Sequence, residues 1–297
     1  SILKPYLYAH ALQEGTILPQ SLLPDIPARM SDYNPVNYSE TYDGAAPAGL
    51  ALQRSLNVPF VMLLQRYGLQ RFHYQLEKGG ITTLNFPAHH YGLPLILGGA
   101  EGSLWDITGL YASMARTLAH YYPQEGAYAE NDFRSLRYTP AFDREEAELY
   151  EQPTVLSAAA IWQTFEQMRR LQRPNSEGDW QSFQSGFPVA WKTGTSFGFR
   201  DAWAVGVTPE YALGVWAGNA DGEGRPGLVG VRAAAPALFE LFDLLESGNA
   251  WFEAPHDEFL EAPVCRRSGY RALPICPADS QLITTGGLRA PACPYHQ

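Results

Sequence analysis

Apolar residues change their spacing partway along this chain, and that change limits the folds it can adopt. In the first part they recur at helical spacing, most clearly over 103–121, where Ser103 is the expected N-cap. Later, short apolar runs separated by turn residues predict an antiparallel meander over 188–196, 202–207 and 211–216. Helices followed by such a meander predict an α+β fold: an antiparallel sheet flanked by helices, with an all-helical subdomain.

The same patterns predict the remaining elements. Residues 15–48 are rich in Pro, Asn, Asp, Ser and Tyr, which indicates a long surface loop. The loop contains Tyr33, Tyr38 and Tyr42. Packing at the surface or in the core is favoured for these tyrosines, and a substrate groove lined by them is the alternative. Further helices are predicted over 1–14, 46–56, 59–67, 154–170 (opened by Thr154) and 231–246 (ending near Gly248).

Composition excludes several classes of protein. A chain of 297 residues that is 45% hydrophobic can bury a large core and is not disordered. Its net charge of -10, without a basic run, argues against nucleic-acid binding. No apolar run approaches the roughly 18–20 residues of a membrane span.

The first motif with chemical meaning is Ser1-Ile2-Leu3-Lys4, an S-x-x-K pattern. Residues three apart share one face of a helix, so the Lys4 amine can lie beside the Ser1 hydroxyl. An adjacent neutral amine can take the proton of a serine and make it a nucleophile, and burial would lower the pKa of that amine. On its own this pattern is common and equally compatible with an exposed lysine at a helix start.

Two further motifs follow. Ser55-Leu56-Asn57 is S-x-N at a corner between two expected helices, where a hydroxyl can relay a proton and an amide can orient a substrate carbonyl. Ser247-Gly248-Asn249 also matches S-x-N, but it follows the last predicted helix and is interpreted as a C-terminal cap. Lys192-Thr193-Gly194-Thr195 lies on the first strand of the meander, where glycine on an edge strand allows a ligand to approach the backbone.

The order of these motifs is more specific than any one of them. The chain contains only three lysines, Lys4, Lys78 and Lys192, and two of them occupy the lysine positions of S-x-x-K and K-T-G. With these motifs the chain resembles the transpeptidase domain of the penicillin-binding proteins, and within that family the 1C branch of the bifunctional class A enzymes. Supporting stretches are 1–6 (SILKPY), 97–104 (LGGAEGSL), 191–201 (WKTGTSFGFRD), 214–218 (GVWAG) and the cysteine-containing tail that ends in CPYH.

The resemblance implies a serine-type D,D-transpeptidase that cross-links peptidoglycan. It assigns Ser1 as the nucleophile that attacks a stem peptide ending in D-Ala-D-Ala, and Lys4 as its general base. Ser55, assisted by Lys192, would pass a proton to the departing D-Ala. β-Lactams would acylate Ser1 in the same way, and no cofactor is implied.

The same resemblance assigns the binding residues. Asn57 would hold the amide of the donor peptide, while Thr193 and Thr195, with Gly194 between them, would bind its terminal carboxylate. The backbone N–H groups of Ser1 and Thr195 would form the oxyanion hole.

Relatives in this family carry sheet strands before S-x-x-K, and class A members carry a glycosyltransferase domain and a membrane anchor. We therefore expect 1–250 to be a transpeptidase domain that lacks its N-terminal strands, and the missing segment to be cleaved, disordered or a separate chain. The expected location is the bacterial periplasm, with the parent protein anchored in the inner membrane. Residues 251–297 are expected to be a linker and the start of a cysteine-containing module.

The cysteines fall close together in that module. Cys265, Cys276 and Cys293 all lie in the last 33 residues, which favours a module held by a disulfide in an oxidising compartment. Cys293 and His296 form a C-x-x-H pair that could ligate a metal, but no second pair is clear. A disulfide is therefore predicted in preference to a metal site.

Three alternatives stay open. A serine β-lactamase would use S-D-N and a water-activating glutamate, whereas this chain has Leu56 in the motif and no convincing equivalent glutamate. An N-terminal-nucleophile hydrolase would start with a strand and use the α-amine of Ser1 as its base. A non-catalytic β-lactam sensor would be acylated stably, as a transpeptidase is.

Overall fold

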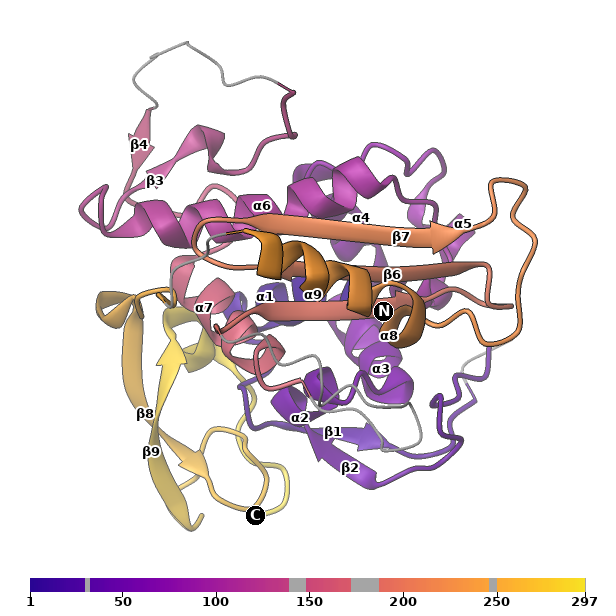
Figure 1. Ribbon diagram of the computed structural model, residues 1–297. Coiled ribbons are helices and arrows are strands. Elements are labelled where there is room, and N and C mark those ends of the chain that lie inside the picture. Colours follow the sequence, from indigo (N-terminus) through magenta and orange to yellow (C-terminus); the bar gives the residue numbers. More distant parts are fainter. Residues whose placement is uncertain (30–32, 139–147, 172–186, 246–249, 297) are drawn as a thin grey trace.

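The computed structural model describes residues 1–29, 33–138, 148–171, 187–245 and 250–296. Its largest sheet has three antiparallel strands in the order β5-β6-β7, formed by Ala190–Thr195, Asp201–Val207 and Ala212–Gly218. Helices cover both faces of this sheet, with α8 and α9 on one side and α6 and α7 toward the other (Figure 1). The predicted α+β class and antiparallel meander are confirmed.

Side chains alternate between the two faces of the sheet, as the period of a strand requires. Ala190 on β5 and Val205 on β6 face a large core formed with the N-terminal helices. Trp191 and Ala204, one position away, instead pack in a smaller core with Phe239 of α9. The neighbouring residues Ala190 and Trp191 of the edge strand β5 therefore pack into two different cores, on opposite faces of the sheet.

Helix α1 (Lys4–Gln13) runs through the large core and is buried along nearly its whole length, in contact with α2, α3 and α7. The structure corrects its predicted start: Ser1 to Leu3 form a turn, and the helix begins at Lys4. Pro5 occupies the first helical turn, where its missing N–H leaves no hydrogen bond unmade. The Lys4 N–H bonds the Ser1 carbonyl at 3.2 Å, which keeps the two residues on one turn of the chain.

The other predicted helices lie within a few residues of their expected positions, whereas α4 and α5 were not predicted from the sequence. The helix expected over 103–121 is α6 (Leu104–Tyr121), and the Oγ of Ser103 caps it by accepting a hydrogen bond from Asp106 N–H. The helix expected over 154–170 begins later because Ser157, not Thr154, supplies its cap. The bounds of the helices not yet given are α2 Ala48–Gln53, α3 Asn57–Tyr67, α4 Leu69–Lys78, α5 Ala88–Tyr91, α7 Ala158–Met168, α8 Gly230–Ala233 and α9 Ala235–Leu244.

Two predictions need correction in detail. The expected loop 15–48 contains a two-stranded antiparallel sheet, in which β1 (Leu22–Asp25) pairs with β2 (Gly44–Pro47). The single helix expected over 231–246 is divided into α8 and α9 because Pro236, in the first turn of α9, has no N–H to continue the preceding helix. The predicted helix end near Gly248 lies outside the described residues.

Small elements complete the fold. They are the short pair β3 (Tyr128–Ala129) and β4 (Leu149–Tyr150) and the 3-10 turns η1 (Leu93–Leu97), η2 (Glu130–Asp132), η5 (His256–Glu258) and η6 (Thr285–Arg289). No helix in the described ranges is both long and apolar enough to cross a membrane.

The C-terminal tail forms a hairpin of β8 (Phe259–Cys265) and β9 (Ala278–Thr284). It is joined to α1 by a hydrogen bond of 2.9 Å from Thr284 Oγ1 to the Leu12 carbonyl. All three cysteines of the tail are free thiols, so the predicted disulfide is wrong in this structure.

Candidate active site

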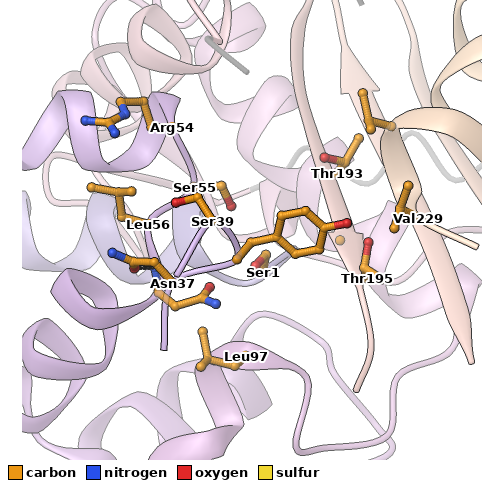
Figure 2. A pocket seen from close by; sticks show the side chains of 14 residues that line it. Ser1, Asn37, Ser39, Arg54, Ser55, Leu56, Leu97, Thr193, Thr195 and Val229 are labelled. Carbon is orange, nitrogen blue, oxygen red and sulfur yellow. Dashed lines mark hydrogen bonds between the residues drawn. The ribbon is translucent and has the colours of Figure 1, made fainter. Parts of the chain in front are cut away.

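The three sequence motifs meet at one pocket between α3 and the edge strand β5 (Figure 2). The pocket encloses about 130 Å³. Figure 2 shows Ser1 between a side that carries Ser55 and Asn37 and a side that carries Thr193 and Thr195. The predicted residues that line it are Ser1, Ser55, Asn57, Thr193, Gly194 and Thr195.

Lys4 connects the first motif to the second. It extends from the first turn of α1, and its side chain is completely buried. Its Nζ donates hydrogen bonds to the Ser55 carbonyl at 2.8 Å and to Asn57 Oδ1 at 2.7 Å, and lies 3.4 Å from Ser55 Oγ. The amine is thus held at the base of the pocket by groups of the S-x-N motif.

Lys192 approaches the same hydroxyl from the sheet. It too is completely buried, and its Nζ donates to Ser55 Oγ at 2.8 Å and to the Thr193 carbonyl at 2.7 Å. Ser55 Oγ therefore lies between two lysine amines. Two positively charged amines held beside one oxygen repel each other.

The backbone at Ser55 is unusual. It lies between α2 and α3 with φ of 55°, a left-handed conformation that costs a residue with a side chain about 1 kcal/mol or more. This conformation ends α2 and lets α3 begin at Asn57, so that the Ser55 carbonyl and the Asn57 side chain both reach Lys4 Nζ. Such backbone strain is typical of positions where the surrounding structure holds a functional side chain in place.

Strand alternation divides the K-T-G-T residues between two faces. Lys192 and Gly194 share one face of β5, and Lys192 contacts Ser55 from it. On the same face, a Cβ added at Gly194 would lie only 3.4 Å from the backbone N of Ile2. Thr195 lies on the other face of the strand, where its Oγ1 accepts a hydrogen bond of 3.0 Å from Gly230 N–H at the start of α8, and it still lines the pocket at the strand edge. Gly194 thus lets the strand lie against the turn that carries Ser1.

The open edge of β5 faces the pocket. In the part of the chain that the structure describes, β5 pairs with β6 alone. Ser196 N–H bonds the Asp201 carbonyl of β6 at 3.0 Å, so the N–H of the preceding residue, Thr195, points to the other edge. That N–H is available to a ligand carbonyl, as the oxyanion-hole assignment requires.

Asn37 is a site residue that sequence reasoning missed. Its Oδ1 accepts hydrogen bonds from the N–H groups of Asn57 and Val58, at 2.9 and 3.1 Å, and so caps α3 from a distant loop. Its Nδ2 donates to buried Asp25 on β1 at 2.7 Å. Because Asn37 is far from α3 in sequence, no local capping pattern could have revealed this contact.

Tyr38, next to Asn37, also lines the pocket, although its ring was expected to pack at the surface or in the core. It is 61% exposed, so it borders the entrance and contributes little to the core. Tyr38 is thus at the surface, as expected, and it also borders the pocket, which is the groove-lining alternative for these tyrosines. The second S-x-N match, at 247–249, lies outside the described residues.

A second cavity, of about 330 Å³, reaches Ser1 from another side and shares Gly194 and Thr195 with the first. Most of its other large side chains are apolar: Ile2, Leu76, Ile81, Leu84, Ile107 and Trp203. The Ser1 residue therefore lies where a polar pocket and a largely apolar cavity meet.

The fold thus brings a serine, two buried lysines and an open strand edge together at one pocket. The chain belongs to the penicillin-binding protein family: the model of the penicillin binding protein transpeptidase domain matches residues 1–231.

Curated relatives support the same family. The chain is 36% identical over 250 residues to penicillin-binding protein 1C of Escherichia coli, covering 84% of this chain and 30% of that protein. It is 28% identical over 275 residues to penicillin-binding protein 1F of Bacillus subtilis, covering 89% of this chain and 36% of that one. The chain thus spans about a third of the length of these relatives, and it is homologous to the class A enzymes.

Solved structures share the fold at lower identity. Penicillin-binding protein 1A from Haemophilus influenzae superposes with a TM-score of 0.68 at 16% identity, over 97% of this chain and 48% of that one. PonA1 from Mycobacterium tuberculosis, solved in complex with penicillin V, superposes with a TM-score of 0.65 at 21% identity, over 85% of this chain and 70% of that one.

Proposed function

We propose that this domain is a serine D,D-transpeptidase that cross-links peptidoglycan and is acylated by β-lactams. The observation that carries the proposal is the position of Ser55 Oγ between Lys4 and Lys192, in a pocket that also contains Ser1 and the open edge of β5. This arrangement provides a nucleophile, a base, a proton relay and an anion-binding edge within one cleft.

In the acylation step, Ser1 Oγ attacks the carbonyl carbon of the penultimate D-Ala while neutral Lys4 takes its proton. The backbone N–H groups of Ser1 and Thr195 stabilise the oxyanion. When the peptide bond breaks, Ser55 gives its proton to the departing D-Ala nitrogen and Lys192 replaces it. The products are an ester on Ser1 and free D-Ala.

Substrate binding is assigned to the flanking residues. The hydroxyls of Thr193 and Thr195 bind the terminal carboxylate, with Lys192 as counter-charge, and Asn57 holds the donor amide. In the second step an amine from a neighbouring stem peptide attacks the ester carbonyl, which forms the cross-link and frees Ser1. Two cavities meet at Ser1, which suits a reaction with two substrates.

We place the domain in the bacterial periplasm, where peptidoglycan is assembled, as part of a parent protein that is held at the inner membrane and also carries glycosyltransferase activity. This wider assignment follows from its kinship with class A enzymes, of which the chain matches only a part.

Labelled penicillin provides the first test, read by intact mass and peptide mapping. The wild-type protein is expected to gain one stable adduct on Ser1, and Ser1→Ala is expected to gain none. Ser39→Ala is the matched control, because Ser39 also lines the pocket and has no assigned role. No adduct on folded wild-type protein, or an adduct on Ser1→Ala, would overturn the proposal.

Two further assays separate the alternatives. Rapid hydrolysis of penicillin would identify a β-lactamase. Among the described residues, the lining of the polar pocket includes no carboxylate, whereas the second cavity at Ser1 is lined by Glu101 and Asp201, so this assay is needed to decide. A peptide ending in D-Ala-D-Ala, supplied with an amine acceptor, is expected to release D-Ala and form the cross-linked product. Stable acylation by penicillin without D-Ala release would identify a sensor.

A further inference from the structure

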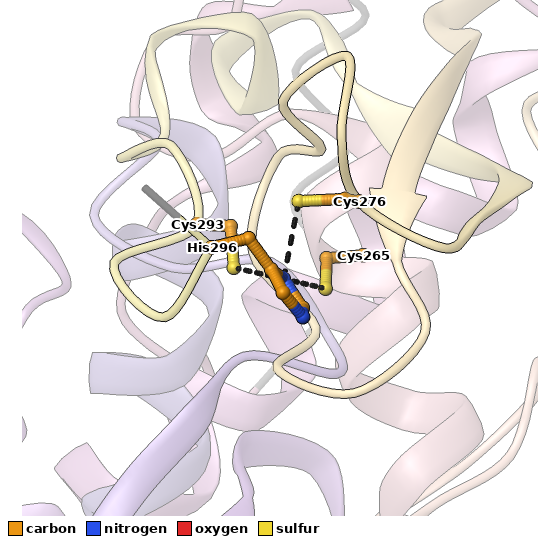
Figure 3. A group of neighbouring side chains, drawn as sticks. All are labelled: Cys265, Cys276, Cys293 and His296. Atoms are coloured by element: carbon orange, nitrogen blue, oxygen red, sulfur yellow. Dashed lines mark hydrogen bonds between the residues drawn. The ribbon is translucent and has the colours of Figure 1, made fainter.

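The three cysteines of the tail converge on one histidine, although they are widely spaced in the sequence (Figure 3). The Sγ atoms of Cys265, Cys276 and Cys293 lie 3.5, 3.3 and 3.3 Å from Nδ1 of His296. All four atoms lie within 4.8 Å of one another, and Cys265 and Cys293 are buried. Figure 3 shows the four side chains pointing toward a common centre.

This geometry matches a tetrahedral metal site. With Zn–S near 2.3 Å and Zn–N near 2.0 Å, tetrahedral angles place sulfur and nitrogen ligands about 3.5 Å apart. The three sulfur-to-nitrogen distances agree with that separation. A single imidazole N–H, by contrast, cannot donate well to three sulfurs at once, whereas one cation can attract all four atoms.

The backbone around the cysteines is arranged as a rigid support. Cys265 ends β8 and begins a tight turn in which Gly269 N–H bonds the Cys265 carbonyl at 2.8 Å. Cys293 is fixed by a backbone bond of 2.8 Å to the Arg271 carbonyl. These bonds fix the backbone that carries the two cysteine side chains.

Two donors also point at the sulfurs. Ser268 Oγ donates to Cys293 Sγ at 3.2 Å, and Leu273 N–H lies 3.2 Å from Cys276 Sγ. Hydrogen bonds of this kind stabilise thiolates around a metal.

We propose that Cys265, Cys276, Cys293 and His296 bind one zinc ion with a structural role. Thiolate and imidazole ligands in a tetrahedral set select zinc among the common cellular divalent ions, and four protein ligands leave no position for a substrate. The C-x-x-H pair noted in the sequence thus finds its partners in two cysteines that lie upstream. The site replaces the disulfide that the sequence predicted.

The zinc site fixes the tail against the segment that leads into β1. Gly269 lies against this segment, where its carbonyl accepts a hydrogen bond of 3.1 Å from Ser21 Oγ. Tyr270 OH donates to the Leu22 carbonyl at 3.0 Å. Leu22 is the first residue of β1, and β1 ends at Asp25, which accepts a hydrogen bond from Asn37 at the active-site pocket. Zinc is therefore expected to stabilise the packing of the tail on the catalytic domain.

Metal content of the full chain provides the direct test, measured by elemental mass spectrometry after purification under reducing conditions. One zinc per chain is expected, together with three thiols that react with a thiol reagent only after chelation. Replacement by Co²⁺ is expected to give the absorption bands of a tetrahedral thiolate complex. Zinc returned to chelated protein is expected to raise the Tm.

Variants of the histidine identify the ligands without removing a cysteine. His296→Ala is expected to lower zinc affinity by about 10- to 100-fold or more, and His296→Cys to retain one zinc because a Cys₄ set is equally tetrahedral. His256→Ala is the matched control, since His256 is an exposed histidine of the same tail. It is expected to bind zinc as the wild type does.

Several results would overturn the proposal. These are a folded chain that takes up no zinc from excess Zn²⁺, thiols that react equally with and without chelator, or a chain mass two hydrogens lower that indicates a disulfide. Equal zinc binding by His296→Ala and wild type would also exclude His296 as a ligand. None of these readouts involves Ser1, so they are independent of the proposed transpeptidase activity.

Discussion

Lys192 donates a hydrogen bond of 2.8 Å to Ser55 Oγ, although the two residues are 137 positions apart in the chain. This bond joins the edge strand of the sheet to the corner between two helices. It also completes a line of polar atoms from Lys4 through Ser55 to Lys192. A proton can therefore travel between the two halves of the pocket along a single hydroxyl.

Ser55→Ala is expected to reduce the rate of acylation by penicillin by about 10²- to 10⁴-fold, because the leaving nitrogen loses its proton donor. The measurement is the second-order rate constant for adduct formation, followed by mass. Ser39→Ala serves again as the control for loss of a pocket hydroxyl. An unchanged rate in Ser55→Ala would exclude the proton relay.

Lys4→Arg and Lys4→Gln are both expected to lose acylation by about 10²-fold or more. Arginine keeps the positive charge but cannot give up its proton, so its failure would show that Lys4 acts as a base. Lys78→Gln is the control, because Lys78 is the one lysine outside the motifs and is exposed. Activity in both Lys4 variants would favour an N-terminal-nucleophile mechanism.

Asn37→Ala is expected to destabilise the domain by about 1–3 kcal/mol, because two N–H groups of α3 lose their acceptor and buried Asp25 loses one of its hydrogen-bond donors. Acylation is also expected to slow, since the position of Asn57 depends on Asn37. Urea unfolding and the acylation rate are the measurements. Asn34→Ala, an exposed asparagine of the same loop, is expected to change neither.

Gly230→Ala is expected to displace the edge of β5. A Cβ at Gly230 would lie 2.5 Å from the carbonyl oxygens of Gly194 and Trp203, which is closer than backbone atoms allow. The cost is about 1–3 kcal/mol of stability, with slower acylation because Thr195 moves with the strand. Gly109→Ala is the control, since its Cβ would make an ordinary contact with Leu136. Wild-type stability and rate in Gly230→Ala would contradict this account.

His10 is expected to make the domain sensitive to acid. His10 lies on α1, and its ring is buried with no hydrogen-bond partner among the described residues. This burial lowers the pKa of His10 from 6.5 to about 3. The unfolded chain therefore binds a proton more readily, and stability falls as the pH decreases from about 6.5 toward 3.

His10→Phe tests this dependence. The free energy of unfolding of wild type is expected to fall by up to about 1.4 kcal/mol per pH unit below pH 6 from this group alone, and the variant is expected to lose that contribution. Urea titrations at a series of pH values measure the slope. His89→Phe, at an exposed histidine, is expected to keep the wild-type slope. Equal slopes in His10→Phe and wild type would show that His10 does not titrate in this range.

The local elements of the fold could be predicted because short-range patterns determine them. Ser103 marks the start of α6 through its own side chain, and alternation with turn residues gives the three strands of the meander. The prediction failed where an element depends on residues distant in the sequence. Strand β1 forms because it pairs with Gly44–Pro47, and α3 is capped by Asn37 from another loop.

The sequence by itself determined which chemistry the chain contains. The ordered S-x-x-K, S-x-N and K-T-G motifs, with two of three lysines in their lysine positions, identified the family that the comparisons then showed. Only the tertiary structure decided which atoms meet: Lys192 reaches Ser55 because β5 turns alternate residues to opposite faces, and three cysteines surround His296 because β8 and the last turns converge. Such contacts depend on long-range packing, which short-range patterns in the sequence do not encode.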